Sequence, residues 1–404
     1  MNEVITIIAM AEFSDVTAET TIQETGVFGT QEAIDNCEST VLPFDHPGGS
    51  HALAVRLPAE LCEYEGGETL PAPYSAGVVE NGSFQPFSST EDFVPEDAPR
   101  QTTDMAQNEN TAFWIETDST ALSFDNWRVF AADLSDRESR LLARSEDVIP
   151  GLFMPAPARL GLTSAGDRTY WNSYSPSPAL QQSIEDKSVD PESLTMLDFV
   201  PTVYSVGQLG GDLQSEVIGA QDFSVLGEGL TYIATAVLDV TDRTLGSDNQ
   251  SIERHFSKAI DSRTVSGVER LVQLNPDANG DYFLDQGITN LQVSGSKIAF
   301  SSASDIYLVD RNTHQVVQFA GDHLLGDDAS VLIPEIVLTD SRISWIVYYN
   351  DQDQTKQTIY TSNLSGSDTK SIQVSSSTEL LDNGTGLTYW TGGHADYRKV
   401  EWKY

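Results

Sequence analysis

Residues 295–319, "GSKIAFSSASDIYLVDRNTHQVVQF", decide the fold. Short runs of β-branched and aromatic residues lie around Ala299 and Tyr307, and a third run ends at Phe319. The polar residues 310–314 separate the second run from the third. Asp, Asn and Gly tolerate the positive φ angles of tight turns, so such residues between apolar runs are typical of hairpins. The stretch therefore predicts antiparallel strands joined in a meander.

The same pattern recurs along residues 109–404. Its core-like strands lie around Trp114, Trp171, Tyr232, Ala299, Trp345 and Trp390, at successive spacings of 57, 61, 67, 46 and 45 residues. The last two spacings match the ~40–50 residues of a four-stranded propeller blade, and the longer ones fit the same unit with loop insertions. One such sheet cannot bury both faces alone, so copies stack around an axis. The sequence predicts an all-β, six-bladed β-propeller, and two β-sandwiches in tandem are the competing interpretation.

Residues 291–319, "LQVSGSKIAFSSASDIYLVDRNTHQVVQF", resemble the WD40-like repeat of TolB-type β-propellers. In that repeat a Gly-containing turn leads into an "I-A-F" strand, then "D-I-Y-L-V-D", a turn and an outer strand. Residues 342–374 are a second recognisable copy, and the other four copies are weaker. "VSGS" and "LTDS" stand where the family has "S-P-D-G", and dipeptidyl-peptidase-type propellers share the repeat. The resemblance implies binding of protein segments at the mouth of a central channel.

The N-terminal region, residues 1–108, differs in composition from the repeats. It is rich in Pro, Glu and Gly, and residues 1–110 hold 20 acidic and 2 basic residues. The last repeat reaches Tyr404 with at most three strands, although an open ring would leave an exposed edge. We therefore expect an irregular acidic region that supplies a ring-closing strand, with residues 52–57 as the candidate. A seventh blade within residues 40–100 is the alternative.

The charge of the chain restricts its partners. Asp and Glu total 61 against 22 Lys and Arg, a formal charge of −39. Such a surface repels nucleic acid and anionic lipid, whereas a basic protein or a cation is easier to accept. The most apolar N-terminal run, "VITIIAMA", is far shorter than the ~20 residues of a membrane-spanning helix. We expect a protein or peptide partner, no nucleic acid and no membrane span in this chain.

The two cysteines, Cys37 and Cys62, both lie in the N-terminal region. An isolated pair suits a disulfide in an oxidising compartment, with two unpaired thiols as the alternative. The sequence predicts an extracellular or cell-envelope protein that forms the outer part of a membrane-anchored one. A cytoplasmic location is the alternative.

Residues 275–286, "NPDANGDYFLDQ", are similar in composition to a calcium-binding loop. Oxygen-bearing side chains fall at positions 1, 3, 5 and 9 of such a loop: Asp277, Asn279, Asp281 and Asp285. The match is incomplete, because Tyr282 stands where a Gly is usual and Ile288 where a bidentate Glu closes the loop. Calcium binding is one interpretation of the stretch, and a plain β-turn is the other.

The motifs of common enzymes are missing from the sequence. It has no G-x-S-x-G, H-E-x-x-H, G-x-x-x-x-G-K-[ST] or G-x-G-x-x-G before a helix. The sequence therefore favours a non-catalytic binding or scaffold propeller, with no catalytic residue assigned. The insertions at residues 175–202 and 241–267 are the candidate binding loops, since loops on a rigid ring commonly carry function. The alternative is a glycoside hydrolase or lyase that uses carboxylates at the channel.

Overall fold

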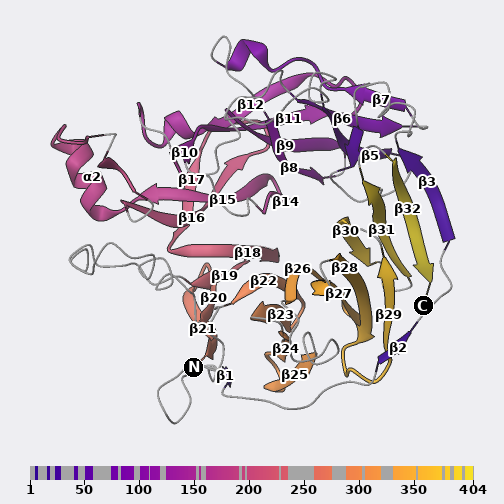
Figure 1. Cartoon of the computed structure of the whole chain (residues 1–404). Coiled ribbons are helices and arrows are strands. Elements are labelled where there is room, and N and C mark those ends of the chain that lie inside the picture. Colours follow the sequence, from indigo (N-terminus) through magenta and orange to yellow (C-terminus); the bar gives the residue numbers. More distant parts are fainter. Residues whose placement is uncertain are drawn as a thin grey trace.

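The computed structural model shows a nearly all-β molecule (Figure 1). It describes residues 5–7, 16–18, 23–28, 41–43, 51–57, 74–80, 83–94, 101–108, 110–118, 124–151, 154–155, 161–190, 193–195, 198–226, 229–234, 259–274, 288–302, 305–319, 331–351, 354–374, 378–382, 386–393 and 396–403. Among these residues the α-helical segment is α2, Pro178–Glu185, and two single turns of 3-10 helix are η2, Glu91–Phe93, and η3, Ser145–Asp147.

Six sheets in residues 101–403 are the predicted blades, numbered here in chain order. Blade 1 holds β8 (Gln101–Asn108), β9 (Thr111–Thr117), β11 (Trp127–Asp133) and β12 (Ser139–Arg144); blade 2 holds β14 (Thr163–Ala165), β15 (Arg168–Pro176), β16 (Phe199–Gly207) and β17 (Gln214–Ile218). Blade 3 holds β18 (Ala220–Leu226), β19 (Gly229–Ala234), β20 (Ala259–Thr264) and β21 (Gly267–Leu274); blade 4 holds β22 (Thr289–Ser294), β23 (Lys297–Ser302), β24 (Asp305–Asp310) and β25 (Gln315–Phe319). Blade 5 holds β26 (Val331–Leu338), β27 (Arg342–Asp351), β28 (Gln354–Asn363) and β29 (Thr369–Val374); blade 6 holds β30 (Thr378–Asp382), β31 (Gly386–Gly393) and β32 (Asp396–Lys403). The β-propeller predicted from the sequence is confirmed.

The N-terminal region contributes a further sheet to the ring, here called the N-terminal blade. Its strands are β4 (Val41–Pro43), β5 (His51–Arg56), β6 (Ser75–Glu80) and β7 (Ser83–Pro86). It stands between blade 6 and blade 1, so the ring holds six sheets from the repeat region and this one besides (Figure 1). This is the additional blade that the sequence left as an alternative. The boundary drawn at residue 108 needs correction, because β8 and β9 on either side of it pair in one sheet.

A different N-terminal strand closes the ring from the one expected. Strand β3, Gln23–Phe28, pairs antiparallel with β32 and becomes the outer strand of blade 6, with Gln23 opposite Glu401. Residues 52–56 instead lie in β5 of the N-terminal blade. Two shorter strands add to outer edges in parallel: β1, Ile5–Ile7, beside β21, and β2, Val16–Ala18, beside β29. A separate pair, β10 (Phe124–Asp125) and β13 (Met154–Pro155), lies outside the blades.

Large aromatic side chains fill the spaces between blades. Trp114 and Phe130 of blade 1 pack against Leu53 and Val78 of the N-terminal blade. Trp127 on the other face of blade 1 meets Trp171 of blade 2 edge to face, with ring centroids 5.3 Å apart. Burying one such side chain stabilises the fold by roughly 1.5–3 kcal/mol. Alternation along each strand thus gives blades 1 to 5 two apolar faces and two packing partners each.

Polar side chains on the innermost strands of blades 1, 3 and 5 tie each of these blades to the next one. Asp104 on β8 accepts hydrogen bonds from its neighbour Met105 N and from Leu162 N at the start of blade 2, both at 2.8 Å. Asp222 on β18 likewise accepts from Leu291 N of blade 4 at 2.8 Å. Glu335 on β26 accepts from Leu380 N of blade 6 at 2.9 Å. These bonds, here called the inner-strand latches, occur where the ladder is interrupted by a bulge.

The antiparallel order gives the ring two chemically different faces. The connections from first to second strand and from third to fourth strand lie on one face, here called the turn face. The connections from second to third strand and from one blade to the next lie on the opposite face, here called the loop face. Turn-face connections are mostly short, while the loop face carries the insertion that holds α2.

The latches predict a specific loss of stability. In Asp104→Asn an amide NH₂ replaces one carboxylate oxygen and faces a backbone N–H donor, so one N–H loses its acceptor. An unpaired buried donor costs about 1–3 kcal/mol, and we expect the free energy of unfolding in urea to fall by that amount. The exposed Asp136→Asn on the turn face is the control and should change stability by less than about 0.5 kcal/mol. Equal losses in the two variants would contradict the latch.

The β24–β25 turn predicts a pH dependence. The hydrogen bond from the Lys297 ammonium, helped by the backbone N–H of Asn312, lowers the pKa of Asp310 well below its usual range. A carboxylate with a lowered folded pKa contributes stability that is present above its unfolded pKa of about 3.9 and lost as pH falls through the folded pKa. We expect Asp310→Asn to lower Tm at pH 7, and the gap to wild type to narrow below pH 4. In a Lys297→Gln background, Asp310→Asn should lower Tm by less. A difference in Tm that does not change with pH would contradict the stabilising role of the Lys297–Asp310 pair.

Candidate functional site

The insertion between β15 and β16 of blade 2 is the candidate binding element. The structure shows that residues 175–202, expected as a binding loop, contain helix α2 on the loop face (Figure 1). Ser177 caps the helix, because its side chain accepts a hydrogen bond from Leu180 N at 3.2 Å. Pro178 occupies the first helical position, where its missing N–H is no loss. The local sequence "SPAL" is thus enough to start the helix.

A small hydrophobic core holds α2 against two blades. Leu180 of the helix packs with Phe199 of blade 2 and with Ile149, which follows η3 in the connection leaving blade 1. Tyr174 and Ile184 pack against this cluster, and burial raises the pKa of the Tyr174 phenol. An eight-residue helix is not stable alone in water, so this core fixes its position. The insertion is therefore a prefolded projection of the ring.

A buried ion cluster anchors the blade 1 side of this projection. Arg128 is 1% exposed, and its guanidinium contacts Asp118 and, at 2.7 Å, the Oε1 of Glu146 in η3. Burial alone would lower the pKa of Arg128, but the hydrogen bonds and charges of Asp118 and Glu146 outweigh it and raise the pKa. Removing one partner of such a buried pair typically costs about 3–5 kcal/mol. Sequence reasoning missed this cluster, because no motif links residues 118, 128 and 146.

The outer side of the insertion is polar and mainly acidic. Gln181 and Gln182 are exposed and donate along the helix to Glu185 and Asp186, at 3.3 and 3.2 Å. Asp190 is also exposed, and Lys187 is the neighbouring cation. Beneath the helix lies a hollow of about 150 Å³ whose lining includes Ser183, Ser188, Ser193, Asp190 and Asp198. Amides, carboxylates and hydroxyls on a fixed helix can form hydrogen bonds and ion pairs with a partner segment.

Basic residues on the turn face are largely used within the fold. A cation at the start of a second strand pairs with an acid near the third-to-fourth turn in three blades: Arg168 with Asp212 at 3.1 Å, Lys297 with Asp310 at 2.5 Å, and Arg342 with Asp368 at 2.9 Å. These pairs stabilise the turns and neutralise the three cations. The α2 insertion on the loop face has no comparable balance between acidic and basic side chains.

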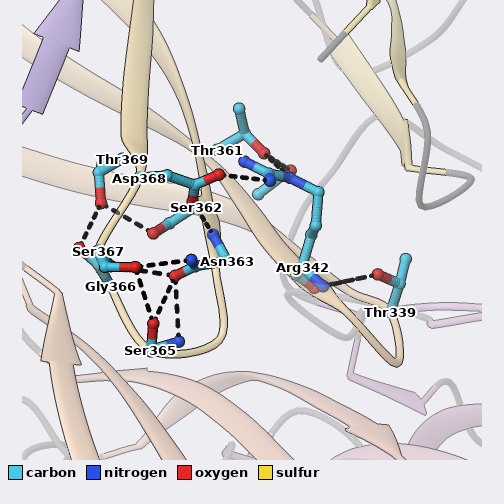
Figure 2. A network of polar contacts seen from close by, with 11 residues as sticks. Thr339, Arg342, Thr361, Ser362, Asn363, Ser365, Gly366, Ser367, Asp368 and Thr369 are labelled. Atoms are coloured by element: carbon cyan, nitrogen blue, oxygen red, sulfur yellow. Dashed lines mark hydrogen bonds and ion pairs between the residues drawn. The ribbon is translucent and has the colours of Figure 1, made fainter.

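The β28–β29 turn of blade 5 shows how completely such turns satisfy their polar groups (Figure 2). The Asn363 Oδ1 accepts from Ser365 N at 3.2 Å and from Ser367 N at 3.0 Å, while its Nδ2 donates to Ser367 Oγ at 2.8 Å. Asp368 accepts from Asn363 N at 2.6 Å and from Arg342 at 2.9 Å. These bonds explain the turn as a structural element.

Several predicted site residues lie outside the part of the chain that the structure describes. They are Asp277, Asn279, Asp281, Asp285, Cys37 and Cys62, together with residues 241–258 of the expected binding loop 241–267. Within the described ranges, no group of three or more His, Cys, Asp or Glu side chains is arranged to hold a metal ion. Calcium binding and the disulfide therefore stay predictions.

The described carboxylates do not show the pattern that a glycosidase requires. A general acid in such an enzyme has a raised pKa in a shared pocket. The carboxyl groups with displaced pKa values are Asp133, Asp212, Asp310 and Asp368, and all four are lowered. Hydrogen bonds from Ser135, Gln214, Lys297 and Asn363 contribute to these shifts, each within a structural turn.

Five tryptophans and His51 have structural roles. Trp127 and Trp402 are at most 1% exposed, which makes them core residues like Trp114, Trp171 and Trp345. The Nε2 of His51 contacts the Oε1 of Gln107 at 3.0 Å, which joins the N-terminal blade to blade 1.

Comparison with known proteins supports the fold. No family model and no curated protein matches the chain. The β-propeller domain of the Trilobed protease from Pyrococcus furiosus is similar with a TM-score of 0.50 and 9% identity, over 90% of this chain and 93% of that one. The acylaminoacyl peptidase from Pyrococcus horikoshii has a TM-score of 0.49 and 10% identity, and the match covers 87% of this chain and 49% of that one. The N-terminal domain of Nup159 has a TM-score of 0.43 and 7% identity, over 98% and 100% of the two chains. Likeness at such identities concerns the fold alone.

Calcium binding at residues 277–285 is testable by unfolding. A ligand that binds only the folded state at 100 times its Kd adds about 2.7 kcal/mol of stability. If the loop binds calcium, Tm should rise in millimolar CaCl₂ relative to EDTA at equal ionic strength. The rise should vanish in Asp281→Ala and persist in Asp136→Ala on the turn face. An identical change of Tm in both variants would mean that calcium does not bind at residues 277–285.

Proposed function

We propose that this β-propeller is a non-catalytic binding module that recognises a protein or peptide through its loop face. The observation that supports the proposal is the α2 projection, a helix held by its own core between two blades with a polar outer side. Preorganisation of this kind lowers the entropy cost of binding, because the contact surface is ordered before the partner arrives. A ring that is packed throughout supplies the rigid support.

The proposed partner carries a cationic segment. Glu185, Asp186 and Asp190 are exposed beside one Lys187, and the whole chain has a charge of −39. Opposite charge on a partner would raise its association rate and exclude acidic competitors, an effect that salt weakens. We therefore expect binding to the loop face to be tighter at low ionic strength.

The finer points of this proposal come from the sequence. The resemblance of residues 291–319 to TolB-type repeats supports recognition of protein segments by a propeller. A disulfide between Cys37 and Cys62 would suit the extracellular space or cell envelope, where we place the protein, as part of a membrane-anchored assembly. Among the described residues, no helix is long and apolar enough to span a membrane.

Charge reversal on the projection tests the proposal. In Glu185→Lys/Asp186→Lys the new cations sit at the C-terminal end of α2, where they favour the helix dipole, so the fold should persist. Immobilised wild type and variant are exposed to cell-envelope extract at low salt, and bound proteins are quantified by mass spectrometry. We expect the amount of a basic protein that the wild type retains to be at least ~10-fold lower on the variant. This is the effect of losing one or two charge pairs.

The matched control reverses two exposed acids on the opposite face, Asp136→Lys/Glu138→Lys, with the same change in net charge. It should retain the partner nearly as well as the wild type. Equal loss in both variants would mean that net charge alone drives retention and would overturn the proposed site. Release of sugar from a polysaccharide panel by the wild type would favour the hydrolase alternative instead.

A further inference from the structure

A hollow of about 170 Å³ opens on the turn face between blades 2 and 3, away from α2. Tyr170 and Glu216 of blade 2 line one side of it, and Leu230, Arg263 and Val265 of blade 3 line the other. The volume suits one aliphatic side chain and little more. This part of the molecule has no role in the proposed binding of a cationic partner.

The exposed Val265 lines this hollow, and two further exposed apolar side chains lie on β18 and β21 of the same blade. Val265 at the tip of the β20–β21 hairpin is 93% exposed, Val268 is 60% exposed and Leu226 is 46% exposed. They make up half of the six large hydrophobic residues that are exposed in the described part of the chain. Apolar groups gathered around a depression mark an interaction site, because water contact with them is unfavourable.

The charges at this corner compensate one another. Glu216 accepts from Ser205 Oγ at 2.5 Å and contacts Arg263 at 3.4 Å and Arg168 at 3.7 Å. Arg270 donates to both oxygens of Asp261, at 2.8 and 3.2 Å. Arg168 also pairs with Asp212 at 3.1 Å, so three cations face three acids in these pairs, and Glu269 is exposed beside Val268. The corner is therefore a partly apolar area of small net charge on a molecule whose total charge is −39.

These features fit a second copy of the chain. In a two-fold symmetric contact a surface meets itself, which favours a surface of low net charge whose projection can fit a depression beside it. Val265 both projects and borders the hollow, so a two-fold axis beside the hairpin would bring the Val265 of each copy to the hollow of the other. A cationic partner would instead prefer the acidic projection on the loop face.

We propose that the blade 2–blade 3 corner of the turn face is the interface of a homodimer, with Val265 as its central contact. The arrangement leaves both loop faces accessible, so one dimer presents two α2 projections. Outside the interface the two copies repel each other through their acidic surfaces. Salt shortens the screening length from about 8 Å at 0.15 M to about 3 Å at 1 M, so dimerisation should strengthen as salt rises.

Sedimentation equilibrium of the full chain at 0.15 M and 1 M NaCl tests this. We expect a monomer–dimer equilibrium whose dissociation constant falls with salt. Val265→Asp and Val265→Lys should each raise the dissociation constant at least ~10-fold, and circular dichroism should show an unchanged fold because the side chain is exposed. The two substitutions of opposite charge separate loss of the apolar contact from a change in net charge.

Leu209→Asp is the matched control. Leu209 is 89% exposed in the β16–β17 turn of the same face but does not line the hollow. It should leave the dissociation constant unchanged. A wild type that stays monomeric at both salt concentrations, or a Leu209→Asp variant that dissociates as readily as Val265→Asp, would overturn the proposal. Because salt should weaken loop-face binding and strengthen the dimer, failure of one proposal is distinguishable from failure of the other.

Discussion

Contact between neighbouring blades is the constraint on which the rest of this structure depends. Each four-stranded sheet has two apolar faces and can bury them only against the sheets beside it. Trp114, Trp127, Trp171 and Trp345 supply much of the buried surface. The inner-strand latches of Asp104, Asp222 and Glu335 add directional contacts between blades, because each acid accepts a hydrogen bond from a backbone N–H of the next blade. Packing brings the blades together, and these bonds help to set how blades 1, 3 and 5 meet the next blade.

Closure of the ring joins the two ends of the chain. The pairing of β3 with β32 places residues 23–28 beside residues 397–401, so the last repeat is completed by the N-terminal region. The pairs β1–β21 and β2–β29 place further N-terminal strands along outer edges. Such edges otherwise expose unpaired backbone groups to other chains. The acidic N-terminal region therefore takes part in the propeller, through a whole blade as well as single strands.

The antiparallel order also separates the chemistry of the molecule into two faces. Turn-face connections are stabilised by local ion pairs such as Arg342 with Asp368, and this face carries exposed apolar side chains at the corner around Val265. The loop face carries α2 with its exposed carboxylates. One ring can thus present an acidic surface for a partner and a neutral surface for a second copy, without overlap between them.

The sequence by itself determined the repeat and hence the propeller, because strand alternation and turn residues are local signals that recur with the period of a blade. It also indicated the insertion at residues 175–202 as a candidate binding element. Only the tertiary structure decided which strand closes the ring, that residues 41–86 form a blade, and that Arg128, Asp118 and Glu146 meet. These are contacts between distant residues that share no spacing or motif, and packing and charge pairing select them only once the blades are assembled.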